Sequence, residues 1–213
     1  MITRLPSQPP RESIAPDELA AYDHIIARSQ KMQMPGAADT SAGPYWGALL
    51  NAPPVAFGLA EMGRIARTGE NRGSYSHAQR ELVDMVMSVD FGYNAILALH
   101  IPDALAVGVR IEAIDAIRAG SDAGLTEEER AICLYTRAVI SGTSSDALFQ
   151  SMVDRLGVRG AIEFTAFITF LLSTMRLWQA LGVPDPSDAD VDSLLDGYRR
   201  KATPLPDPKM RIA

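Results

Sequence analysis

Cysteine is almost absent from this 213-residue chain, in which Cys133 stands alone. A single thiol cannot form an intrachain disulfide, a Cys-x-x-Cys redox pair or a thiolate metal site. Histidine is also scarce, with only His24, His77 and His100, so we expect no bound metal. An unpaired cysteine is typical of a reducing compartment, which favours a cytoplasmic protein.

An excess of positive charge is missing as well. The 20 Lys and Arg residues face 26 Asp and Glu residues, a net charge of -6, which argues against a nucleic-acid-binding surface. Residues 1–6 contain no apolar run typical of a signal peptide. Other apolar runs are interrupted before the length of about 18 residues that a membrane span needs, so we expect no membrane association.

Strand signals are also missing, because no segment alternates apolar and polar residues between turn signals. Helical spacing of apolar residues instead predicts an all-α fold. We expect an arm over residues 1–15, a single domain over 16–183 and a tail over 184–213.

The capping-box patterns Ser76-x-x-Gln79 and Thr126-x-x-Glu129 mark two helix starts. Helices are predicted over 16–33, 53–68, 76–89, 93–107, 111–119, 126–140, 146–156, 158–181 and 190–199.

The predicted helix 158–181 is the most apolar segment of the chain. A helix that is apolar on every side is expected to be buried on every side. In a chain of this size, such burial indicates a subunit interface as well as a core. We therefore expect a homo-oligomer, namely a dimer, trimer or hexamer.

Two polar residues lie almost equally far from the turn predicted at residues 90–91. Glu81 precedes this turn and His100 follows it, so two antiparallel helices would bring them to the same level. His100 shares an apolar stripe with Tyr93 and Ile96, which indicates that it faces the interior, where Glu81 is its natural partner. A carboxylate beside an imidazole can fix one tautomer, raise the basicity of the ring and pass a proton. A pair that only stabilises the core is the alternative interpretation.

The neighbours of this pair also form a pattern. Arg80 directly precedes Glu81, and His100 is followed by Gly108-Val109 and then by Glu112-Ala113-Ile114. In order and spacing, these residues resemble the carboxymuconolactone decarboxylase / alkylhydroperoxidase-D-like family. That family carries Arg-Glu on the first helix of a hairpin and, in its redox branch, Cys-x-x-Cys-x-x-x-His on the second. The resemblance covers residues 40–185.

The two cysteine positions of that motif hold Tyr93 and Ile96 in this chain. Thiolate attack on a peroxide and a disulfide cycle are therefore disfavoured. The branch of the family that lacks the cysteines works by proton transfer on small oxoacids or lactones and needs no cofactor. The resemblance thus implies an alkylhydroperoxidase-D-like helical bundle acting as a lyase, decarboxylase or isomerase in the catabolism of aromatic compounds, on a small aromatic-derived acid or lactone.

Roles for individual residues follow from this resemblance. His100 is expected to be the general acid and base, oriented by Glu81 and assisted by Tyr93. Substrate contacts are expected from Arg80, Tyr45, Trp46 and Ile96, whereas His24 and His77 are expected to face solvent.

Two other classes of function stay open. A hydrolase or hydratase would use His100 to activate water in the same pocket. A non-catalytic oligomeric binding protein would keep the family core after losing the cysteines.

Overall fold

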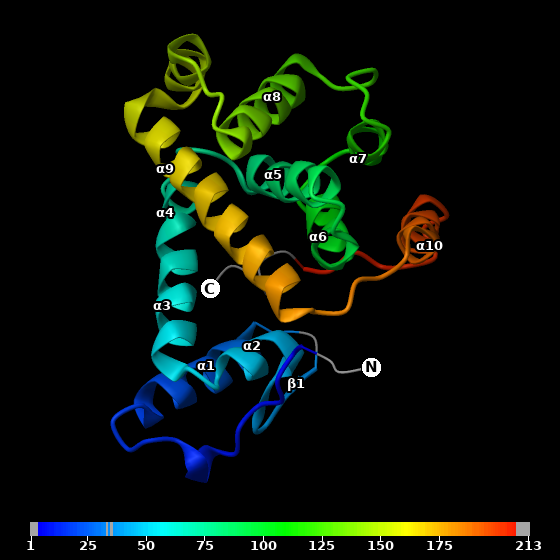
Figure 1. The fold of residues 1–213 in the computed structure, drawn as a ribbon. Helices are drawn as coiled ribbons and strands as arrows, with labels where there is room; N and C mark the ends of the chain where they lie inside the picture. Colours follow the sequence, from blue (N-terminus) through cyan, green and yellow to red (C-terminus); the bar gives the residue numbers. More distant parts are fainter. Residues whose placement is uncertain (1–3, 33, 35, 208–213) are drawn as a thin grey trace. The chain divides into compact units, whose positions relative to one another are not determined.

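The computed structural model describes residues 4–32, 34 and 36–207, and these are mostly helical, which confirms the predicted all-α class (Figure 1). Within these described residues, a 3-10 turn η1 (Arg11–Ser13) precedes ten helices. These are α1 (Leu19–Lys31), α2 (Gly43–Leu49), α3 (Pro53–Ala66), α4 (Thr68–Asn71), α5 (His77–Asp90), α6 (Asn94–Ala106), α7 (Ile111–Arg118), α8 (Glu127–Ser141), α9 (Asp146–Leu181) and α10 (Asp188–Arg199).

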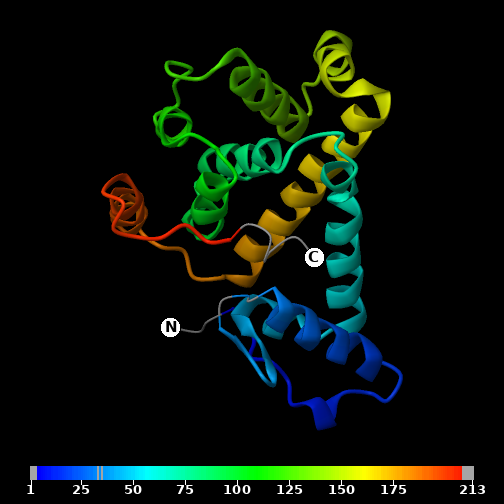
Figure 2. The ribbon, with the colours of Figure 1, turned by 180° about the vertical axis from the view of Figure 1, so that it is seen from behind.

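Backbone contacts group the described chain into two compact units. The first contains the residues up to Ile65 together with Arg176–Val183, and there α1 packs against α2. The second contains Ala66–Met175 and residues 184–207, and there α5 packs against α6, α7 and α8 (Figure 2). The predicted limits of the arm, domain and tail stay predictions.

A short hairpin forms between α1 and α2, in a segment for which the sequence predicts no helix. Strand β1 (Ala37–Ala38) pairs antiparallel with β2 (Ser41–Ala42). Strands of two residues are too short to show a periodic pattern, which explains why the sequence gives no strand signal.

The hairpin of α5 and α6 is built as the sequence predicts. The Ser76 hydroxyl accepts from the backbone N–H of Gln79 at 3.1 Å, and the Gln79 side chain accepts from the N–H of Ser76, which starts α5 at the expected place. Gly92, with φ of 58°, lets the chain turn after α5, and the N–H of Tyr93 donates to the Ser88 carbonyl at 2.8 Å. The turn therefore fixes α5 and α6 as antiparallel neighbours.

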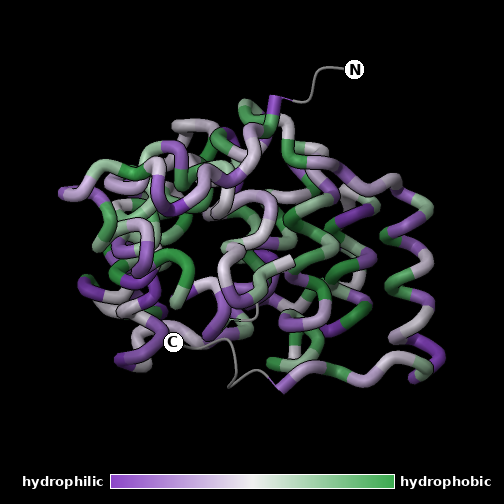
Figure 3. Tube along the Cα trace, turned by 90° about the horizontal axis from the view of Figure 1, so that it is seen from below, coloured by the Kyte–Doolittle hydropathy of each residue, from purple (hydrophilic) through white to green (hydrophobic). Residues whose placement is uncertain are grey.

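Helix α9 is interrupted at Gly157, where φ is 71° and ψ is 166°. The predicted separate helices 146–156 and 158–181 are thus confirmed. In the single chain, Val158 and Ile162 are 61% and 57% exposed, so burial of this helix on every side is not reached within one chain. Hydrophilic and hydrophobic residues are interspersed along the described chain (Figure 3).

Among the described helices, α9 alone has the length and hydropathy that would suit a membrane span. Of its most apolar stretch, 33% is buried inside the structure. Core helices of soluble proteins can have the same length and hydropathy. This is weak support for a membrane segment, and the structure is compatible with a soluble protein.

Replacing Gly157 by alanine should destabilise the fold. An L-residue is strained at this φ and ψ, at a cost of about 1–3 kcal/mol in the free energy of unfolding. Gly58→Ala is the matched control, because Gly58 lies within α3 with no atom within 4 Å of an added Cβ, and should gain about 0.5–1 kcal/mol. Urea unfolding measures both, and equal stability of the two variants would contradict the account.

Candidate functional site

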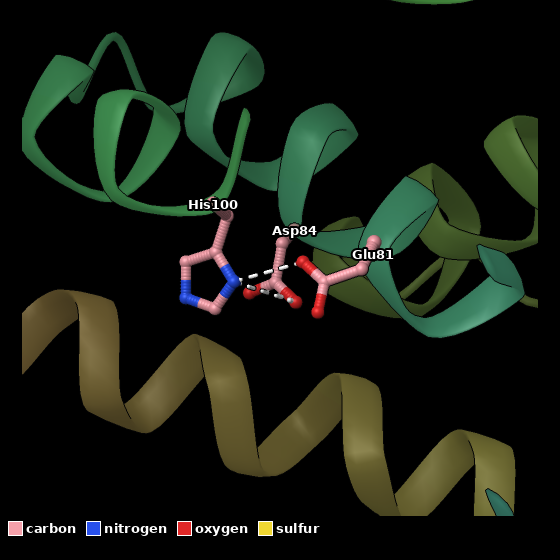
Figure 4. Close-up of side chains that lie close together, drawn as sticks. All are labelled: Glu81, Asp84 and His100. Atoms are coloured by element: carbon pink, nitrogen blue, oxygen red, sulfur yellow. Dashed lines mark hydrogen bonds and ion pairs between the residues drawn. The ribbon is translucent and has the colours of Figure 1, made fainter. Parts of the chain in front are cut away.

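Facing polar side chains of α5 and α6 form a cluster inside the second unit. His100 Nδ1 lies 2.9 Å from Glu81 Oε2 and 3.8 Å from Asp84 Oδ2 (Figure 4). The expected contact between Glu81 and His100 is confirmed. The other ring nitrogen, Nε2, points away from both carboxylates (Figure 4). Of the two ring nitrogens, Nδ1 is therefore the one that contacts the carboxylates.

Glu81 is the centre of this cluster and is only 1% exposed. Its Oε1 lies 2.9 Å from His77 Nε2 and pairs with Arg80 Nη2 at 2.8 Å, while its Oε2 faces His100. Burial would raise the pKa of Glu81, but the charge and hydrogen bond of His100, the hydrogen bond of His77 and the charge of Arg80 outweigh burial and hold this pKa well below 4.5. Glu81 is therefore ionised at neutral pH.

His77 differs from its prediction. It was expected to face solvent, but its side chain is only 12% exposed and contacts Glu81. As the first residue of α5, His77 lies four positions before Glu81, so one helix face carries both. The prediction was wrong because polar residues on this helix face inward.

Asp84 is a second carboxylate beside His100 that the sequence interpretation missed. It is fully buried, and within the described chain neither of its carboxylate oxygens has a hydrogen-bond partner. Burial raises the pKa of Asp84 from 3.8 to about 6, although the charge of His100 opposes this rise. Its position three residues after Glu81, on the same helix face, is the signal that could have revealed it.

The two carboxylates act together on His100. Burial alone would lower the pKa of this imidazole, but the charges of Asp84 and Glu81 and the hydrogen bond to Glu81 raise it above 6.5. The site therefore favours the imidazolium, which can donate a proton from Nε2.

Arg80 is engaged by carboxylates of its own unit. Its guanidinium pairs with Glu70 and with Glu81, and the residue is 3% exposed. Burial would lower the pKa of Arg80, but the charges of Glu81, Glu70 and Asp84 raise it. These ion pairs favour positioning of Glu81 over the predicted contact with a substrate.

The remaining predicted site residues are buried. Tyr93 caps α6, and burial raises the pKa of its phenol to about 12, so it can act only as a hydrogen-bonding group near neutral pH. Ile96 is 4% exposed on the same helix. Tyr45 and Trp46 lie in α2 of the first unit, where the ring of Tyr45 is 4.4 Å from that of Trp178. Their role in substrate binding stays a prediction.

Cys133 lies on α8, away from the cysteine positions of the motif. It is buried, and burial raises the pKa of its thiol to about 11. The thiolate needed for attack on a peroxide is therefore strongly disfavoured.

Within the described residues, Glu81, Asp84 and His100 each offer one donor atom, and these atoms lie within 4.8 Å of one another. Two carboxylates and an imidazole are a donor set that divalent cations accept. In this cluster, however, Arg80 and the two histidines already contact the Glu81 carboxylate. We therefore interpret the cluster as one that holds a proton.

Comparison of the chain with protein-family models, with curated proteins and with solved structures gives no match. The resemblance to the carboxymuconolactone decarboxylase / alkylhydroperoxidase-D-like family stays a prediction from the sequence.

Asp84→Asn should change how stability depends on pH. Because the folded pKa of Asp84 is about 6 and the unfolded value is 3.8, the folded chain binds more protons between these values and loses stability as the pH rises through them. The difference in melting temperature, Asp84→Asn minus wild type, should therefore increase as the pH rises from about 4 to about 6. Thermal unfolding at a series of pH values measures this, with the exposed Asp122→Asn as the control, and parallel profiles for Asp84→Asn and wild type would contradict it.

Proposed function

We propose that the chain is a cofactor-independent lyase, decarboxylase or isomerase that acts by proton transfer on a small, aromatic-derived acid or lactone. The supporting observation is the 2.9 Å contact between His100 Nδ1 and the buried, ionised Glu81, which leaves Nε2 directed away from both carboxylates. We also propose that the helices form an alkylhydroperoxidase-D-like bundle in a cytoplasmic protein.

The chemistry of a decarboxylation fits the charge of this site. Loss of carbon dioxide from a substrate carboxylate leaves the bonding electron pair on carbon as a carbanion or enolate. His100 Nε2–H donates a proton to that carbon, and the neutral imidazole then regains a proton from water. Glu81 and Asp84 raise the pKa of His100 and so favour the imidazolium, the proton donor, before the transfer. Isomerisation would use the same nitrogen, first as a base and then as an acid.

Hydrolysis is possible at the same nitrogen, with His100 accepting a proton from water instead of donating one to carbon. The raised pKa of His100 favours the proton-donating role, because less neutral imidazole is then present to activate water. For this reason we favour the lyase over the hydrolase.

A non-catalytic binding protein is the second candidate, and a specific observation favours it. Tyr93 and Ile96, which stand at the cysteine positions of the motif, are each 4% exposed. A packed environment at these positions would suit a core in which Glu81 and His100 only satisfy one another.

His100→Ala should separate the two candidates. Turnover should fall by about 10²–10⁴-fold if Nε2 transfers the proton. The assay incubates a panel of aromatic oxoacids and lactones in deuterated water and follows carbon dioxide release and deuterium incorporation by NMR. Glu81→Gln should lower the rate and shift its pH optimum, because it keeps the shape of the side chain but removes the charge that favours imidazolium.

The control for this experiment is His24→Ala, since His24 is 41% exposed at its side chain and lies in the first unit. Melting temperature and rate are measured on the same samples. Unchanged turnover per folded molecule in His100→Ala, or no turnover of the panel by the wild-type chain, would favour the non-catalytic candidate.

We further propose that the chain assembles as a dimer, trimer or hexamer through α9, because Val158 and Ile162 expose apolar surface. Light scattering should give a mass above that of one chain, and Val158→Asp combined with Ile162→Asp should lower it. Leu205→Asp is the control, since Leu205 is 49% exposed but lies outside α9. A wild-type monomer at micromolar concentration would contradict this assembly.

A further inference from the structure

One arginine beside the Glu81 cluster has a buried nitrogen without a hydrogen-bond partner within the described chain. Arg67 lies between α3 and α4, and its Nε is buried without a hydrogen-bond partner within the described chain. Arg80, in contrast, is engaged by Glu70 and Glu81. Arg67 therefore has a hydrogen-bond donor available for a ligand, whereas the guanidinium of Arg80 is occupied by two carboxylates.

Arg67 is close to the site in the fold. It precedes Glu70 by three residues, and Glu70 pairs with Arg80, which in turn pairs with Glu81. The charge of Arg67 interacts with those of Arg80, Asp84, Glu81 and Glu70, all of which lie in the second unit. Arg67 thus shares the electrostatic environment of His100.

The charge of Arg67 is poorly compensated in this position. Burial and the neighbouring charge of Arg80 lower its pKa, and the nearby carboxylates only partly offset that effect. A buried guanidinium without a bonded partner costs free energy, which an anion at the site would recover. Carboxylates suit this role, because guanidinium donors match their two oxygens in a planar, bidentate arrangement.

We propose that Arg67 binds the carboxylate of the substrate, so that the site selects small organic acids over their neutral esters and over lactones that carry no carboxylate. This inference rests on the proposed function, and it replaces Arg80 by Arg67 as the substrate-binding arginine. Arg80 then positions Glu81, and the two guanidiniums have separate roles.

The first test needs no ligand. Arg67→Met should lower the melting temperature less than Arg80→Met does, because Arg67 Nε holds no hydrogen bond that the substitution would break and the apolar side chain has a similar length. Arg80→Met should lower the melting temperature, because it strands Glu70 and Glu81. A loss of stability in Arg67→Met as large as that in Arg80→Met would show that Arg67 is a structural ion-pair residue and would overturn the proposal.

The second test measures binding with benzoate and methyl benzoate as probes. Benzoate should stabilise the wild-type chain in thermal unfolding and bind in calorimetry, whereas methyl benzoate should do neither. Arg67→Met should weaken benzoate binding by about 10–100-fold, the usual effect of losing a charge-assisted hydrogen bond. Arg67→Lys should keep part of the binding, and Arg64→Met is the control, since Arg64 is 60% exposed at its side chain.

The outcomes separate this inference from the proposed function. His100→Ala should still bind benzoate even where turnover is lost, because Arg67 is intact. Benzoate binding that survives in Arg67→Met, equal binding of the ester, or no binding of benzoate to the wild-type chain would each overturn the role of Arg67. None of these results depends on whether His100 is catalytic.

Discussion

A buried negative charge must be compensated, and the Glu81 carboxylate is the charge around which the second unit is organised. Its two oxygens are held by His77, Arg80 and His100, which come from two helices joined by one tight turn. Removing His100 would leave Oε2 in the core without this partner, whereas Oε1 is contacted by both His77 and Arg80. The capping box of α5 and the turn at Gly92 matter because they bring these donors to one level.

The balance of charges around Glu81 explains why protonation is central to the site. Glu70, Glu81 and Asp84 supply three carboxylates, whereas Arg67 and Arg80 supply two guanidiniums. A further positive charge is needed, and a proton on His100 or on Asp84 provides it. Both groups have raised pKa values, so the cluster retains a proton near neutral pH. A proton held in this way can be given to a substrate.

Much of the local structure could be predicted from the sequence, because the signals are short-range. The capping boxes at Ser76 and Thr126 start α5 and α8 in the structure, and Gly157 separates the two halves of α9. The pairing of Glu81 with His100 followed from their equal distance from one turn. Each of these inferences needed only helix geometry.

The inward position of His77 and Asp84 could not be found in the same way. Helix α5 is buried along Arg80–Ser88, so its polar residues do not mark a solvent face. Hydrophobic periodicity assumes such a face, and tertiary packing overrides it here. The lack of a partner for Arg67 Nε results from tertiary packing, which no local pattern encodes. The contact between Glu81 and His100 could therefore be predicted from the sequence, whereas the positions of His77 and Asp84 became visible only in the structure.

The central claim is that Glu81 holds His100 as a proton-transfer group, and the most direct measurement is a pH titration of the His100 ring by nitrogen-15 NMR. Signals of the three histidines can be assigned with single substitutions. The account predicts a pKa for His100 above 6.5, a neutral form that carries its proton on Nδ1, and a lower pKa in Glu81→Gln. A His100 pKa at or below 6.5 that does not change in Glu81→Gln would contradict the account.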